Sequence, residues 1–143
     1  MAIVEQLQDD VKSAMKAGEK DKVQALRLIV AELQRAAKDG NEDEVAILQT
    51  ARKKRLESAK AFRDGGRDES ADQEESEAAL IEGYLPAQIS DDDLKAIVAG
   101  AIESTGAASP ADIGKVMGAV MPQVKGQADG NRVSAAVKEL LAS

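Results

Sequence analysis

The sequence predicts an all-α fold in two parts, for three reasons. Apolar residues recur at three- and four-residue spacing along nearly all of the 143 residues. No segment shows the every-second-residue alternation of a half-buried strand. Glycine and proline separate the apolar-patterned segments, where they end one helix and begin the next. We therefore expect an N-terminal portion of four helices over 1–89 and a smaller three-helix C-terminal lobe over 90–143.

Two amphipathic segments at the N-terminus, about 3–17 and 21–38, predict a helical hairpin. Each segment places its apolar side chains on one stripe. Gly18 lies between the segments, and Asp39-Gly40-Asn41 is a strong stop signal after the second. Because two short amphipathic helices joined by a tight turn pack against each other, these segments should form the first hairpin.

The next two segments, about 42–64 and 68–85, predict a second hairpin that reverses at a pair of glycines. Large apolar residues are concentrated where the first segment begins and where the second ends. Between 52 and 77 the large apolar residues are Leu56 and Phe62. We therefore expect a hairpin whose root lies in the core, and whose residues 52–77 are helical but exposed.

Charge is segregated on this second hairpin. The outgoing helix carries the basic residues Arg52, Lys53, Lys54, Arg55, Lys60 and Arg63. The returning helix carries the acidic residues Asp68, Glu69, Asp72, Glu74, Glu75 and Glu77. One interpretation is ion pairing across a solvated hairpin, where each exposed pair contributes about 0–1 kcal/mol. The other is a basic strip that contacts RNA phosphate, with the members Arg52, Lys53, Arg55 and Lys60.

Three further helices are predicted in the C-terminal lobe. Ser90 is a typical N-cap for a helix at about 91–104, and the aspartates of its first turn favour the helix dipole. Consecutive helical residues point about 100° apart, so these aspartates do not form a cation site. Ser109-Pro110 begins a helix that ends at or near Pro122, and a last helix covers about 130–141.

The composition excludes several kinds of chemistry. The chain has no His, Cys or Trp. Only carboxylates remain as side-chain ligands for zinc, and the Ser-His-Asp and Cys-His nucleophile pairs cannot be built. Its two aromatic residues cannot form a stacking platform for several bases. We therefore predict no catalytic residue, no metal and no cofactor.

The charge balance and the hydrophobic pattern restrict the kinds of partner that the chain can bind. Lys and Arg number 19 against 26 Asp and Glu, for a net charge of −7, which argues against charge-driven coating of DNA. No apolar segment approaches the roughly 20 residues of a membrane span. Acidic residues stand near the N-terminus, where a signal peptide needs an apolar region. We expect no DNA partner, no membrane partner and a cytoplasmic location.

The segment 114–130 holds a candidate nucleic-acid site. Gly114 and Gly118 lie four residues apart on one helix face, which indicates either close helix packing or a smooth surface against an RNA backbone. If Asp129 caps the last helix, backbone N–H groups at its start would attract phosphate. The flanking basic residues are Lys115, Lys125 and Arg132. The alternative is a capped turn with solvated basic residues.

Four segments carry a family resemblance. The stretch 114–130, Tyr84-Leu85-Pro86-Ala87-Gln88-Ile89-Ser90, Arg27-Leu28 and the stretch 52–59 are similar to stand-alone YqeY proteins of the GatB/YqeY family. The resemblance covers essentially the whole chain. The stretch 114–130 also resembles the tail of GatB, a subunit of the glutamine-dependent aminoacyl-tRNA amidotransferase.

The resemblance implies an all-α fold of two subdomains and an association with tRNA. The matching positions for RNA contact are Lys115, Lys125 and Arg132, with Gly114, Gly118 and Gly126 beside them. It implies a binding module without catalysis of its own, because separate parts of the amidotransferase hydrolyse glutamine and activate the acyl group with ATP. Two alternatives are an adaptor for a translation-related protein, and an accessory that acts only within a larger carbon–nitrogen ligase with glutamine as amido-N-donor.

One position departs from the family pattern. Family members commonly carry a basic residue after Lys-Gly, where this chain has Gln127. The missing charge predicts weaker contact with phosphate at this site.

Overall fold

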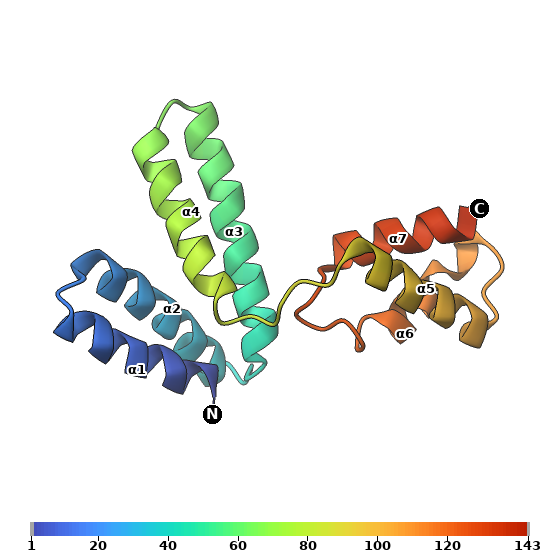
Figure 1. Cartoon of the computed structure of the whole chain (residues 1–143), viewed down its shortest axis with the longest axis horizontal. Helices are drawn as coiled ribbons and strands as arrows, with labels where there is room; N and C mark the ends of the chain where they lie inside the picture. Colours follow the sequence, from blue (N-terminus) through green and yellow to red (C-terminus); the bar gives the residue numbers. More distant parts are fainter. Residues whose placement is uncertain (1, 143) are drawn as a thin grey trace. The chain divides into compact units, whose positions relative to one another are not determined.

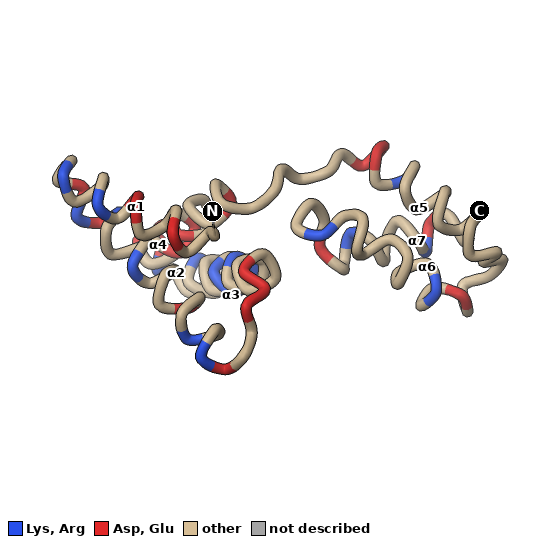
Figure 2. The backbone as a smooth tube through the Cα atoms, turned by 90° about the horizontal axis from the view of Figure 1, so that it is seen from below, with Lys and Arg blue, Asp and Glu red and all other residues tan. Residues whose placement is uncertain are grey.

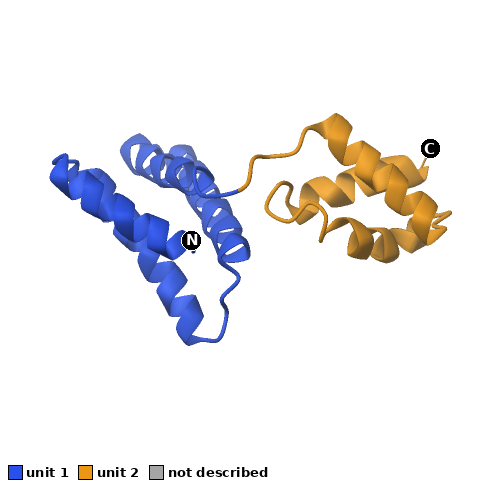
Figure 3. Ribbon diagram, turned by 60° about the horizontal axis from the view of Figure 1, so that its bottom comes forward, with its two compact units in different colours: residues 1–85 blue, residues 86–143 orange. Residues whose placement is uncertain are grey.

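The computed structural model describes residues 2–142, and over this range it contains seven α-helices, one short 3-10 helix and no strand (Figure 1). The prediction of an all-α fold is therefore confirmed. The chain divides into two compact units, Met1–Leu85 and Pro86–Ser143 (Figure 3). The boundary thus precedes residues 86–89, which belong to the second unit.

The first hairpin of unit 1 consists of α1 (Ile3–Lys16) and α2 (Lys20–Lys38). Gly18 adopts a φ of 74° in the turn between them, a conformation that favours glycine. The largest fully buried side chains of this unit come from both hairpins: Leu7, Leu26, Ile29, Leu48 and Ile81. One core therefore joins the two hairpins.

The start of α1 is capped by a residue of a distant helix. Ala2, at the N-cap position, makes no side-chain cap hydrogen bond. Instead the Glu44 carboxylate accepts hydrogen bonds from the backbone N–H groups of Ile3 (3.0 Å) and Val4 (2.9 Å). These N–H groups have no partner within a helix. Glu44 therefore ties the first turn of α1 to the first turn of α3.

The second hairpin consists of α3 (Glu44–Asp64) and α4 (Asp68–Glu82). Its inner face is built from the buried alanines Ala51, Ala59, Ala71 and Ala78. The expectation that residues 52–77 would be exposed is wrong for this inner face. Alanines allow two helices to approach closely, so the hairpin packs without large apolar side chains. Arg55 and Glu77 are buried in the same region.

The two hairpins of unit 1 diverge from a common root. α2 packs against α3 and, less extensively, against α4, whereas α3 and α4 pack along each other. Figure 1 shows α2 and α4 facing each other across the opening that results. Residues of α2 and α4 line an open groove.

Unit 2 is a bundle of α5 (Asp91–Thr105), α6 (Ile113–Val120) and α7 (Gly130–Ala142), with a 3-10 turn at Pro110–Asp112. Its core is rich in valine, with Val98, Val116, Val120, Val124, Val133 and Val137 all fully buried. The Ser90 hydroxyl accepts the Asp93 N–H at 3.1 Å, as the N-cap prediction requires. No helix within residues 2–142 is long and apolar enough to cross a membrane.

Candidate nucleic-acid interface

Two of the segments that carry the family resemblance, 84–90 and 114–130, are joined by hydrogen bonds in unit 2. The Ile89 N–H donates to the Gln127 carbonyl at 2.9 Å, and the Gln88 side-chain amide donates to the Gly126 carbonyl at 3.3 Å. The Arg132 guanidinium donates to the Ile89 carbonyl at 2.9 Å. The segment before α5 is thus fixed to the loop before α7. We call this junction the loop clamp.

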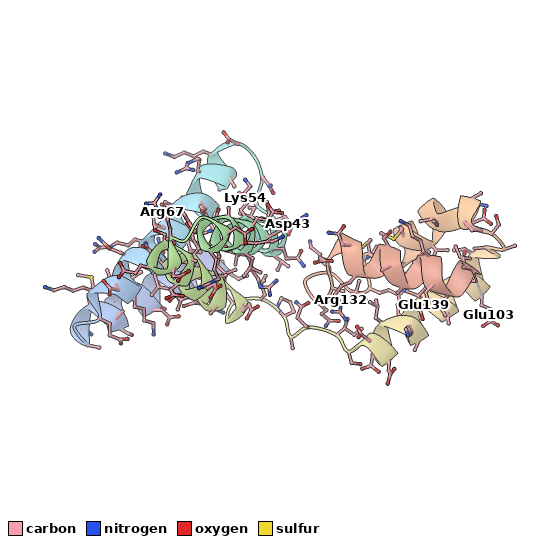
Figure 4. All side chains as sticks on the ribbon, turned by 90° about the horizontal axis from the view of Figure 1, so that it is seen from above. Asp43, Lys54, Arg67, Glu103, Arg132 and Glu139 are labelled. Atoms are coloured by element: carbon pink, nitrogen blue, oxygen red, sulfur yellow. The ribbon has the colours of Figure 1, made fainter. Side chains whose placement is uncertain are left out.

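Arg132 lies at the start of α7, within the loop clamp (Figure 4). Its guanidinium also pairs with Asp91 at 2.8 Å, and its side chain is 31% exposed. Its backbone N–H donates to the Asp129 carboxylate at 2.8 Å. Asp129 therefore caps α7 as expected, and the Arg132 amide is not available to phosphate. The Arg132 side chain, through the Ile89 carbonyl and Asp91, holds the loop in place.

Gly126 occupies the one position of the loop clamp where glycine is required by the backbone. It is buried, and its φ is 79°. Other residue types adopt this left-handed conformation at a cost of about 1–2 kcal/mol. Gly126 therefore shapes the loop that presents Lys125.

The glycines of α6 lie on an open face. Gly114, Lys115 and Gly118 are exposed, while Val116 and Val120 on the other side of the helix are fully buried. A Cβ atom built on either glycine would meet nothing within 4 Å. Within unit 2 these glycines bring no neighbouring helix close, so the helix-packing interpretation is wrong for this unit. We call this surface the α6 glycine face.

The two candidate lysines are exposed at opposite ends of α6. Lys115 is in the first turn, and Lys125 follows the end of a helix that is about 12 Å long. Hydrogen bonds from the backbone N–H groups of Ala108 and Ser109, and then the charge of Lys115, lower the pKa of Asp112. Lys115 therefore lies near a carboxylate that is ionised. The two candidate lysines are therefore separated along the chain by most of α6 and the turn that follows it.

The second candidate, the basic strip on α3, is divided by the structure. Arg55 is only 8% exposed and pairs with Glu32 (3.1 Å) and Glu77 (3.5 Å). Arg55 is thus not available to RNA and is removed from the strip. Arg52 pairs with Glu82. Of the four proposed members, Lys53 and Lys60 remain exposed without an ion pair among the described residues.

The ion-pairing interpretation of the second hairpin is confirmed for every arginine of α3. Near the tip, Arg63 pairs with Asp68 (3.6 Å), Asp72 (2.9 Å) and Glu75 (3.0 Å). In Figure 2, which views this hairpin nearly end-on, basic positions are visible on α3 and acidic positions on α4. The planar guanidinium groups form ion pairs with the carboxylates, whereas the lysines of this helix are exposed to solvent. Sequence spacing alone could not predict that the arginines of α3 form ion pairs and that its lysines remain exposed.

Two comparisons with known proteins found matches over nearly the whole chain. A curated relative from the fungus Pyrenophora tritici-repentis (strain Pt-1C-BFP) is named "Altered inheritance of mitochondria protein 41, mitochondrial". The two sequences are 26% identical over an alignment of 148 residues, and the alignment covers 97% of this chain and 81% of the relative. The sequence profile described as YqeY-like protein matches residues 4–141, which is nearly the whole chain. The chain therefore belongs to the YqeY-like protein family.

Proposed function

We propose that this YqeY-like chain is a non-catalytic module that binds the tRNA backbone through unit 2. The observation that carries the proposal is the α6 glycine face. A helical glycine costs about 1 kcal/mol relative to alanine, yet nothing in unit 2 occupies the space that Gly114 and Gly118 leave open. A sugar-phosphate backbone is a ligand that would use this close approach, and the exposed Lys115 lies beside it.

The proposed contacts are electrostatic. Lys115 and Lys125 meet phosphate groups, and Arg132 holds the loop that carries Lys125. Contacts with phosphate position a protein without reading sequence, so different tRNAs should bind with similar affinity. With few contacts and a net charge of −7, binding should be modest and should weaken steeply as salt rises.

The test is a titration of labelled tRNA over a salt series with a matched pair of glycine variants. Gly118→Ala adds a methyl group to the α6 glycine face, and Gly100→Ala adds the same group to an open, exposed face of α5. Each change should stabilise the fold by about 0.5–1 kcal/mol, because glycine disfavours helix. Only Gly118→Ala should weaken binding of tRNA.

Two results would count against the proposal. One is no binding of wild type at low salt. The other is an equal change of tRNA affinity in the two variants, since a methyl group on α5 should not affect tRNA binding. Binding that requires added amidotransferase subunits would favour the accessory role instead.

A further inference from the structure

We propose that the groove between α2 and α4 binds an amphipathic helix of a partner protein, with the basic edge of that helix along α4. The proposal concerns unit 1 and goes beyond the tRNA contacts of unit 2. The groove is an open space of about 1590 Å³. A helix with its side chains is about 10–12 Å across, so this volume corresponds to about three helical turns. The size fits a helix rather than a small molecule.

Apolar residues line both walls of the groove, and one of them is largely exposed. Leu28 of α2 lines it and is 52% exposed, which makes it one of the few large apolar side chains on the described surface. Leu80 of α4 lines the opposite wall, and Ala25 and Ala79 lie beside these leucines. The core of unit 1 uses other residues of α2, namely Val23, Leu26, Ile29 and Leu33. Leu28 and Leu80 thus provide apolar anchors that the fold itself leaves partly open.

The α4 wall carries carboxylates and no basic residue. The sequence of α4, DESADQEESEAALIE, contains seven acidic residues and no basic residue. Two of them, Asp72 and Glu77, line the groove. Glu77 is buried beside Arg55, whereas Asp72 shares Arg63 with Asp68 and Glu75 and keeps a side chain that is 71% exposed. Glu69, three residues before Asp72, is exposed and has no ion pair among the described residues. This wall repels RNA and attracts a cationic partner.

The α2 wall is of mixed charge. Lys20, Lys22 and Arg27 line it together with Glu19 and Asp21. The partner helix is therefore expected to be basic on the edge along α4, apolar on the stripe that meets Leu28 and Leu80, and polar without net charge on the other edge. The binding mode is that of a helix laid in a groove.

The probes are three helical peptides with identical leucine positions that differ along one edge. The edge carries lysine in the first peptide, glutamine in the second and glutamate in the third. Anisotropy titrations with the full chain at low salt should give the order of affinity lysine, glutamine, glutamate. Binding should also shift the backbone amide NMR signals of Leu28 and Leu80.

Two pairs of variants locate the site. Gln73→Lys places a positive charge on the acidic wall, whereas Gln6→Lys places one on an exposed position of α1 outside the groove. Gln73→Lys should weaken the lysine peptide about two- to fivefold and improve the glutamate peptide, as expected for one exposed charge pair. Gln6→Lys should change neither. Leu28→Gln should weaken all three peptides, whereas Leu56→Gln, at another exposed leucine, should weaken none.

The proposal fails if the three peptides bind equally, or if the shifted NMR signals lie outside the groove. A concentration-dependent dimer that Leu28→Gln abolishes would identify the occupant as a second copy of the chain and overturn the proposal. Displacement of the peptide by tRNA would assign the groove to RNA. Because Gly118→Ala tests tRNA binding on unit 2, this inference and the proposed function can fail independently.

Discussion

Arg55 shows how burial changes the role of a charged residue. It lies among the basic residues of α3, yet it is held between Glu32 and Glu77 inside unit 1. Replacing Arg55 with Met should destabilise the fold by about 3 kcal/mol, because Glu77 would remain buried without its partner. Urea unfolding measures the loss. Lys53→Met, at an exposed position of the same helix, should change stability by no more than about 0.5 kcal/mol, and an equal loss in both variants would contradict this account.

Glu74 links the same region to pH. Burial, and then Glu77, raise its pKa above the ordinary value of 4.5. For an acid with a raised pKa in the folded state, the contribution to stability is full below pH 4.5 and is lost as pH rises through the folded pKa. Glu74→Gln should therefore be more stable than wild type at pH 7, and this gain should disappear below pH 4.5. Unfolding curves at both pH values test this, with Glu69→Gln, an exposed acid of the same helix, as the control. The same gain at both pH values would contradict it.

Gln127 provides a gain-of-function prediction for the tRNA site. Its backbone carbonyl, not its side chain, accepts the Ile89 hydrogen bond of the loop clamp. The side chain can therefore change without loss of that bond. Gln127→Arg should strengthen tRNA binding and steepen the salt slope by about one unit. Gln127→Met is the uncharged control, and if it strengthens binding as much, charge is not the cause.

At the residue scale, part of the candidate site could be predicted from the sequence. The capping roles of Ser90 and Asp129 were predictable, because each depends on an N–H group three residues along the chain. The division of the α3 basic residues was not predictable. It depends on Glu32 and Glu77, which folding brings to Arg55 from two other helices.

At the scale of elements, helix boundaries followed local signals closely. The last helix was expected over 130–141 and covers Gly130–Ala142. The sixth was expected to begin at Ser109-Pro110, but its first turn is a 3-10 turn at Pro110–Asp112, and α6 ends at Val120. The loop clamp was not foreseen, because its hydrogen bonds join residues about 40 positions apart, such as Gln88 and Gly126.

The Glu44 cap gives a prediction at this scale. Glu44→Ala should destabilise unit 1 by about 1–2 kcal/mol, because the N–H groups of Ile3 and Val4 lose their acceptor. Hydrogen exchange should show faster exchange at the start of α1 as well. Glu42→Ala, an exposed residue just before α3, is the control. Unchanged protection of α1 in Glu44→Ala would show that the cap is dispensable.

For the whole molecule, the sequence predicted the class of fold, and the hydrophobic pattern was sufficient for that. It also predicts that the isolated chain has no glutaminase or ATPase turnover, since the chain has no His or Cys to activate a nucleophile and no P-loop motif. Assays of glutamate release and phosphate release on repurified protein test this. Turnover that survives repurification and is lost on substitution of one residue of this chain would overturn the prediction.

The carboxylate that completes the first turn of α1 also constrains the order of folding. The cap joins positions 41 and 40 residues apart, so α1 cannot satisfy its first N–H groups until the chain has closed a long loop. A nascent chain that has emerged only through α2 would hold a first helix with a frayed start. The N-terminal hairpin should thus reach its full native protection late, once the beginning of α3 has been synthesised and has docked.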